Sequence, residues 1–243
     1  MTYIIPAAGK GKFLQSITLN YPKTSYKLDE NTSVIQRLVR GIRKYDKNAE
    51  IVVIVGYMFG NVKKELEDDN VIFVQNPFYD VTNSISSLWF AREYLERENV
   101  TILHGDMVFA DSIMEKYIIS DTDYPYVFID KTANKEDSYN AMIKEDKIVT
   151  MSRGLVNSSV KYCGVIKLDP VSSRLLKREI DSMIQNNMYD LYWEDAMVQM
   201  IMFRRFELYY RDISNDEWAE VNSVEDLIHA QDIHKNSIGG NVR

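Results

Sequence analysis

Short apolar segments alternate with segments of helical periodicity along the first half of the chain. Strand-like runs occupy residues 3–7, 50–56, 71–75, 100–105 and 126–130. The runs at 50–56 and 100–105 are almost continuously apolar, which is typical of parallel strands covered on both faces. Helical patterns lie between the runs, at residues 33–45, 61–69 and 83–98. This alternation predicts a doubly wound α/β sheet.

After about residue 131 the pattern changes to alternating strands and longer helices. Residues 140–153 alternate in two pieces around Glu145 and Asp146, which predicts a β-hairpin. Further strands are predicted at 160–169 and 206–213, and further helices from Pro170, from Tyr192 and after Ser223. We expect one domain over residues 1–243, in which a mixed, mostly parallel sheet carries a small antiparallel extension.

Composition narrows the class of protein. The chain is 45% hydrophobic, with a net charge of -7 and no long run of lysine or arginine, which argues against nucleic-acid binding. No apolar run approaches the ~18–20 residues of a membrane span, and the start of the chain carries no export signal. The single Cys163 excludes an internal disulfide, and three histidines without metal-like spacing argue against zinc. We expect a cytoplasmic protein with small-molecule partners, and a homodimer is compatible with this picture.

Two basic features are expected at the carboxyl ends of the strands, where open α/β sheets bind ligands. The AAGKGK loop, residues 7–12, has small residues that let backbone amides approach a polyphosphate, and two lysines that supply charge. It has neither the Walker spacing nor the dinucleotide fingerprint, so a plain strand–helix turn is the alternative. Lys23 follows Pro22 at the rim, where the alternative is a solvated surface lysine.

Oxygen donors are expected at the same edge of the sheet. Asp106 follows a buried strand, where it suits either a metal or the cap of a helix from Asp111. Glu220 and Asn222 share one side of a strand just before the last helix. Their oxygens suit Mg²⁺, and the alternative is a strand end followed by a helix cap.

An aromatic and acidic cluster opens the helix near residue 192. It consists of Tyr192, Trp193, Glu194 and Asp195. Aromatic faces beside carboxylates suit an ammonium group, through cation–π attraction and charge. The alternative is that Tyr192 and Trp193 belong to the hydrophobic core.

Together these motifs resemble the nucleotidyltransferase superfamily, and within it the CTP:phosphocholine and phosphonate cytidylyltransferase branch. The similarity lies in the alanine-alanine-glycine-x-glycine loop, the Pro22-Lys23 pair, and the segments VGYM (55–58), NPFYDVTNSISSLWFAREYL (76–95), DLYWEDAM (190–197) and EVNSVEDL (220–227). The resemblance implies a Rossmann-like three-layer fold with a nucleotide-binding half, 1–131, and an acceptor-binding half, 132–235. It also implies transfer of CMP from CTP to a small phosphorylated amine or alcohol, or to a phosphonate, with release of pyrophosphate.

The resemblance further implies roles for single residues. Lys23 and Asp106 would be catalytic, and Asp106, Glu220 and Asn222 would hold Mg²⁺. The residues that would bind the nucleotide are Ala7, Ala8, Gly9, Lys10, Gly11, Lys12, Tyr57, Asn83 and Ser87. The residues that would bind the acceptor are Lys161, Tyr192, Glu194 and Asp195, with Arg153 as a further candidate for its phosphate.

Two positions depart from the family pattern. Phe13 stands where arginine is usual, and Lys10 or Lys12 would replace its forked guanidinium with a point charge. Asn222 stands where these cytidylyltransferases usually have aspartate, so metal affinity should fall and Glu220 should matter more. The alternatives are a sugar-1-phosphate nucleotidyltransferase that uses UTP or dTTP, and a non-catalytic nucleotide-binding domain.

Overall fold

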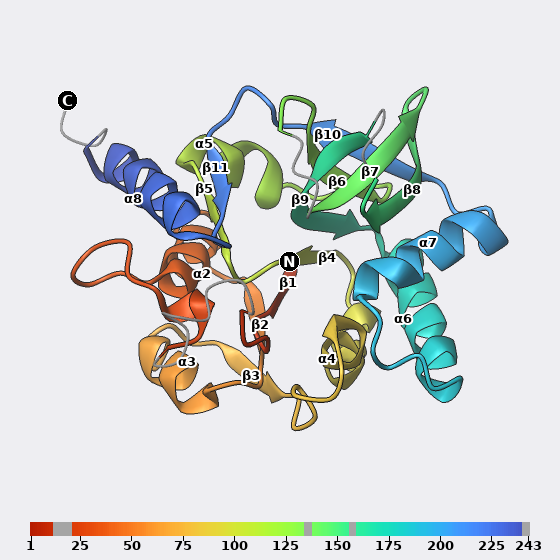
Figure 1. Cartoon of the computed structure of the whole chain (residues 1–243), viewed down its shortest axis with the longest axis horizontal. Helices are drawn as coiled ribbons and strands as arrows, with labels where there is room; N and C mark the ends of the chain where they lie inside the picture. The colour runs from red at the N-terminus through yellow and green to blue at the C-terminus, as the bar shows by residue number, and fades with distance from the viewer. Residues whose placement is uncertain (12–20, 134–137, 156–158, 240–243) are drawn as a thin grey trace.

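The apolar runs form the strands of one sheet in the computed structural model, which describes residues 1–11, 21–133, 138–155 and 159–239 (Figure 1). The strands of this sheet are β1 (Thr2–Pro6), β2 (Glu50–Val55), β3 (Ile72–Gln75), β4 (Val100–Leu103), β6 (Tyr126–Asp130), β7 (Tyr139–Lys144), β8 (Lys147–Arg153), β9 (Ser159–Leu168) and β10 (Leu208–Asp212). Across the described residues their order is β3-β2-β1-β4-β9-β6-β10-β8-β7.

Helices cover both faces of the sheet. They are α2 (Val34–Tyr45), α3 (Phe59–Glu65), α4 (Ser84–Phe90), α5 (Asp111–Ile113), α6 (Pro170–Gln185) and α7 (Trp193–Arg204). A further helix, α8 (Val224–Gly239), packs on a small second sheet. Successive strand residues point to opposite faces, so Ile5 packs in one apolar cluster with α2 and α3, and Ile4 in another with α4, α6 and α7. This three-layer arrangement confirms the predicted fold. In the part of the chain that the structure describes, no helix is long and apolar enough to cross a membrane.

The ten-residue strand β9 runs antiparallel to its neighbours in the sheet. β9 lies antiparallel to β4, with Leu103 opposite Val165, and antiparallel to β6 and β7 as well. Among the described strands of this sheet, five pairings are antiparallel and four are parallel. The predicted mixed sheet is therefore present, but its antiparallel part is larger than the small extension we expected, because β9 contacts three neighbours.

A second, two-stranded sheet lies between the main sheet and α8. It pairs β5 (Met107–Phe109) with β11 (Trp218–Glu220) in antiparallel register, with Glu220 opposite Met107. Side chains of both strands pack against α8 in a separate apolar cluster. β5 was not predicted, since three residues are too few to display a hydrophobic period.

One predicted helix boundary, the start of α6, follows from local chemistry, and another differs from the prediction. Pro170 begins α6, and Asp169 caps it: its Oδ1 accepts hydrogen bonds from the N–H groups of Val171 at 2.9 Å and Ser172 at 3.2 Å. The helix predicted over 83–98 instead ends at Phe90 and continues as a 3₁₀ turn, Arg92–Glu96.

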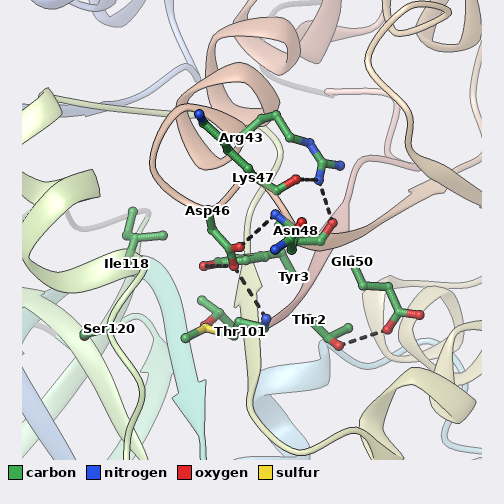
Figure 2. Close-up of polar contacts among 12 residues, drawn as sticks. Thr2, Tyr3, Arg43, Asp46, Lys47, Asn48, Glu50, Thr101, Ile118 and Ser120 are labelled. Atoms are coloured by element: carbon green, nitrogen blue, oxygen red, sulfur yellow. Dashed lines mark hydrogen bonds and ion pairs between the residues drawn. The ribbon is translucent and has the colours of Figure 1, made fainter.

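Polar contacts fix the ends of β1 and β2 that lie opposite the carboxyl ends (Figure 2). Thr2 Oγ1 donates a hydrogen bond to Glu50 at 2.9 Å, and the N-terminal amine lies 3.5 Å from Asp46. Arg43 donates to the carbonyl oxygen of Lys47 at 3.0 Å (Figure 2). These contacts hold the register of the two strands, and therefore the positions of the loops at their far ends.

Replacing the cap of α6 should destabilise the protein. Asp169→Ala leaves two backbone N–H groups without an acceptor, so the free energy of unfolding should fall by about 0.5–2 kcal/mol. Urea unfolding followed by circular dichroism measures the change. Asp169→Asn keeps an acceptor oxygen and is the matched control; an equal loss in both variants would contradict the capping role.

Candidate active site

The AAGKG loop leaves β1 and lies against the end of β2. The Tyr57 N–H donates a hydrogen bond to the carbonyl oxygen of Ala8 at 3.0 Å. A Cβ on Gly56 would lie 2.9 Å from the same oxygen, so the loop can approach β2 this closely only because Gly56 has no side chain. Beyond this contact Gly9 and Lys10 are exposed. The loop backbone is therefore accessible to a ligand.

The end of this loop rests on Lys23. Gly11 has a φ of +70°, in the left-handed region that favours glycine, and a Cβ there would lie 3.3 Å from the aliphatic part of Lys23. Of the two lysines predicted to meet phosphate, Lys10 forms an ion pair with Asp80. Lys12 lies outside the described residues. Lys23 is thus the lysine that the structure places directly beside the loop.

Lys23 is at the centre of a charged network. Its ammonium forms an ion pair with Asp106 and donates a hydrogen bond to Asn222 Oδ1 at 3.1 Å. The Val221 N–H donates to the carbonyl oxygen of Asp106 at 3.0 Å, which holds β11 beside the end of β4. Burial acts to lower the pKa of Lys23, but the carboxylates of Asp106 and Glu220 outweigh it and raise the pKa above its ordinary value. Lys23 is therefore a cation.

A second lysine–carboxylate pair lies beside the first. Lys161 Nζ, on β9, is 2.6 Å from Glu220 Oε2, on β11. Burial acts to raise the pKa of Glu220, but the charges of Lys161 and Lys23 outweigh burial and lower this pKa to about 2. Glu220 is therefore ionised, and Lys161, predicted to meet the acceptor, is bonded to a predicted metal ligand.

The structure brings together the residues predicted to hold Mg²⁺. Asp106 and Asn222 bind one cation already, the Lys23 ammonium, and the charge of Lys23 also acts on Glu220. No group of three or more histidine, cysteine, aspartate or glutamate residues suited to a metal is found among the described residues. Mg²⁺ is commonly held by one or two carboxylates plus substrate phosphates. The donor set fits such a shared site better than an all-protein cage.

The other residues predicted to bind nucleotide lie around α4 and the end of β2. Lys10 Nζ lies 6.0 Å from the centroid of the Tyr57 ring. Asn83 caps α4, and Ser87 Oγ accepts a hydrogen bond from Asn76 Nδ2 at 3.0 Å. Asn76, which was not singled out from the sequence, is buried and supports Ser87 through this bond; its position just after β3 was the available signal.

The carboxylates of the aromatic and acidic cluster are bonded within the protein. Glu194 Oε1 lies 2.7 Å from His104 Nε2. Asp195 accepts hydrogen bonds from the Tyr139 hydroxyl at 2.8 Å and from the Tyr192 N–H at 2.9 Å. Burial acts to lower the pKa of His104, but the Glu194 carboxylate raises it above its ordinary value. These contacts fix the start of α7 against β4 and β7.

The aromatic members of the cluster divide between core and site. Trp193 is 1% exposed and belongs to the core, as the alternative interpretation held. Tyr192 is half-buried, and the guanidinium of Arg153 lies 4.7 Å from its ring centroid. Tyr139, whose ring meets that of Tyr192 edge-on at 6.0 Å, was missed from the sequence.

Removing the charge of Lys161 should change how stability depends on pH. The Glu220 pKa falls from 4.5 to about 2 on folding, so the pair stabilises the fold above pH 4.5 and loses this contribution as the pH falls toward 2. Lys161→Met should therefore lower the free energy of unfolding most at pH 7, and by progressively less toward pH 3.5. Urea unfolding across this range measures the difference.

The control for this experiment is an exposed pair. Lys147 Nζ lies 2.7 Å from Glu207, and the two side chains are 37% and 59% exposed. Lys147→Met should cost less than about 1 kcal/mol. A deficit of Lys161→Met that stays constant with pH would contradict the stabilising pair.

Comparison with known proteins identifies relatives in sequence and in fold. No protein-family model matches the chain. It is 24% identical over 241 residues to the choline-phosphate cytidylyltransferase of Streptococcus pneumoniae, covering 97% of this chain and 99% of that protein. The solved CTP:phosphocholine cytidylyltransferase from Streptococcus pneumoniae matches with a TM-score of 0.77 at 19% identity, over 96% of this chain and 98% of that one. The inositol-1-phosphate CTP transferase from T. maritima matches with a TM-score of 0.74 at 20% identity, over 96% of both chains. The predicted resemblance is confirmed: this chain has the nucleotidyltransferase fold and is similar along almost its whole length to a choline-phosphate cytidylyltransferase.

Proposed function

We propose that this protein is a cytidylyltransferase that transfers CMP from CTP to a small phosphorylated amine or alcohol, or to a phosphonate. The observation that carries the proposal is the network of Lys23, Asp106 and Asn222 beside the AAGKG loop. The similarity to a choline-phosphate cytidylyltransferase over 97% of the chain supports CTP as the donor and a phosphorylated acceptor.

The chemistry of this transfer requires cations more than it requires a base. An oxygen of the acceptor phosphate or phosphonate attacks the α-phosphorus of CTP, a P–O–P bond forms, and the bond to the β-phosphate breaks as pyrophosphate leaves. The nucleophile is already an anion, so the obstacle is repulsion between anions and the charge that develops on the leaving group. Fixed cations at that position contribute most of the catalysis. Lys23, oriented by Asp106 and Asn222, supplies such a cation.

We assign Mg²⁺ binding to Asp106, Glu220 and Asn222. When bound, Mg²⁺ would neutralise phosphate charge and so reduce repulsion during attack. Two carboxylates and one amide oxygen are hard ligands of the kind that Mg²⁺ prefers. Because Asn222 contributes no charge, the ionised Glu220 carries more of the affinity than it would beside a second aspartate.

The loop of residues 7–11 would bind the triphosphate. Gly9 has open space around it and Gly11 turns in the left-handed region, so the backbone amides of the loop can approach phosphate oxygens. We assign Tyr57, Asn83 and Ser87, at the α4 side of the loop, to the remainder of the nucleotide.

The acceptor would bind on the other side of the network. Lys161 is buried and bonded to Glu220, and Glu194 is buried and bonded to His104. These two side chains would therefore support the acceptor site without contacting the acceptor. Tyr192 is partly accessible, and its position is held because its backbone N–H donates a hydrogen bond to Asp195.

In this proposal the chain is one domain with two halves. Residues 1–131 would bind the nucleotide and residues 132–235 the acceptor. A cytoplasmic location suits the buried thiol of Cys163 and the requirement for CTP.

A panel assay tests the proposed activity. Pyrophosphate release should occur with CTP and one amine-bearing phosphate or phosphonate, and should stop when EDTA removes Mg²⁺. Release with UTP or dTTP and a sugar phosphate would instead identify a sugar-1-phosphate nucleotidyltransferase. Nucleotide binding without release for any acceptor would favour a non-catalytic domain.

Loss of either member of the Lys23–Asp106 pair should abolish turnover. One opposite charge at 4 Å is worth about 4 kcal/mol at an effective dielectric near 20, or about three decades in rate when it acts in the transition state. Lys23→Ala and Asp106→Asn should each lower kcat/KM by about this factor, while circular dichroism shows a folded protein. Lys147→Ala, on the exposed pair, is the control. Near-normal rates in either site variant would refute these roles.

A further inference from the structure

Arg153 occupies the place where an aromatic site would receive a cationic head group. It is the last residue of β8, and its guanidinium lies 4.7 Å from the centroid of the Tyr192 ring. Cations bind aromatic faces within about 6 Å of the ring centroid. A quaternary ammonium at this face would have to displace the guanidinium or lie beside a charge of the same sign. The face of the Tyr192 ring is therefore a poor binding site for the trimethylammonium group of choline.

Arg153 lies beside the aromatic residues Tyr139 and Tyr192, and its charge also acts on Lys23. Its repulsion acts to lower the pKa of Lys23, which belongs to the catalytic network. Arg153 also lies opposite Tyr139 in the pairing of β7 with β8, and the Tyr139 ring meets that of Tyr192. Arg153 thus lies at the aromatic cluster, and its charge reaches the Lys23 network.

The carboxylates around Arg153 have other partners. Asp195 accepts hydrogen bonds from Tyr139 and Tyr192, and Glu194 is bonded to His104. Arg153 itself is exposed and has no ion pair with another of the described residues. A forked guanidinium of this kind binds carboxylates and phosphates through two parallel hydrogen bonds.

We infer that the acceptor carries a carboxylate in addition to its phosphate or phosphonate, and that Arg153 binds this carboxylate across the ring of Tyr192. The inference rests on the proposed function and narrows its acceptor. The phosphoryl group lies at the Lys23 network, where it attacks CTP, and the far end of the acceptor reaches Arg153. Substrates that end in trimethylammonium alone are disfavoured, because they meet a fixed positive charge.

Two matched pairs of acceptors test this inference. Phosphoserine and phosphoethanolamine differ only by a carboxylate, and so do 2-amino-3-phosphonopropionate and 2-aminoethylphosphonate. With CTP and Mg²⁺, kcat/KM from pyrophosphate release should be higher for the carboxylate-bearing member of at least one pair, and phosphocholine should be a poor substrate. Arg153→Gln should lower the ratio of the two kcat/KM values within that pair by about 10- to 100-fold.

Two further variants separate this role from a general effect. Arg153→Lys keeps the charge but loses the fork, so its ratio should fall between those of wild type and Arg153→Gln. Arg211 is a matched control, because it is also exposed and lies 5.5 Å from the ring centroid of Tyr117. Arg211→Gln should leave the ratio unchanged.

Three outcomes would overturn the inference. Preference of the wild type for phosphocholine or for the acceptors without a carboxylate would do so. An equal loss on all acceptors in Arg153→Gln would show that Arg153 binds the phosphoryl group they share. Absence of turnover with every nucleotide and acceptor would overturn the proposed function, and the inference with it, and is distinct from the first two outcomes because no ratio can then be measured.

Discussion

The ion pair between Lys23 and Asp106 is the interaction on which the arrangement of the site depends. It joins residues 83 positions apart, and the same ammonium binds Asn222, 199 positions from Lys23. Asp106 is 5% exposed, and a buried carboxylate without a partner costs several kcal/mol. The segment that carries Lys23 must therefore return to the end of β4, and Gly11 lets the AAGKG loop lie against Lys23.

The small sheet of β5 and β11 brings Asp106 and Asn222 together at the Lys23 ammonium. Asp106 directly precedes β5, and Asn222 follows β11 by two positions. Their antiparallel register places Glu220 opposite Met107, so both predicted metal-binding segments end at one place. Packing of both strands on α8 holds this register. The predicted metal ligands are therefore positioned by strand pairing and apolar packing.

The sequence predicts those features whose cause is local. The apolar runs of β2 and β4 reflect burial on both faces, and Asp169 with Pro170 marks the start of α6. The direction of β9 could not be predicted, because a buried strand has the same apolar pattern beside parallel and antiparallel neighbours. β5 was missed because three residues show no period.

The same distinction applies to the site. The motifs predicted which segments meet, but they carry no information on the partner that each charge takes. Lys161 bonds to Glu220, 59 positions away, and Glu194 to His104, 90 positions away. Such pairings are set by the tertiary fold. The assignment of Lys161 to the acceptor rested on resemblance and that of Glu194 also on the chemistry of its cluster, and both stay predictions.

In the proposed function, these pairings would make substrate binding an exchange of partners. Lys23 can turn its ammonium from Asp106 to a phosphate only if another cation replaces it, because the buried carboxylate would otherwise be left unpaired. In the proposed function, binding of the triphosphate at Lys23 would therefore be coupled to binding of a cation at Asp106. Arg153 is different: it is exposed, and no described carboxylate depends on it. Arg153 can bind an anion without leaving a carboxylate unpaired, so in the proposed function it would distinguish acceptors with little effect on the Lys23 network.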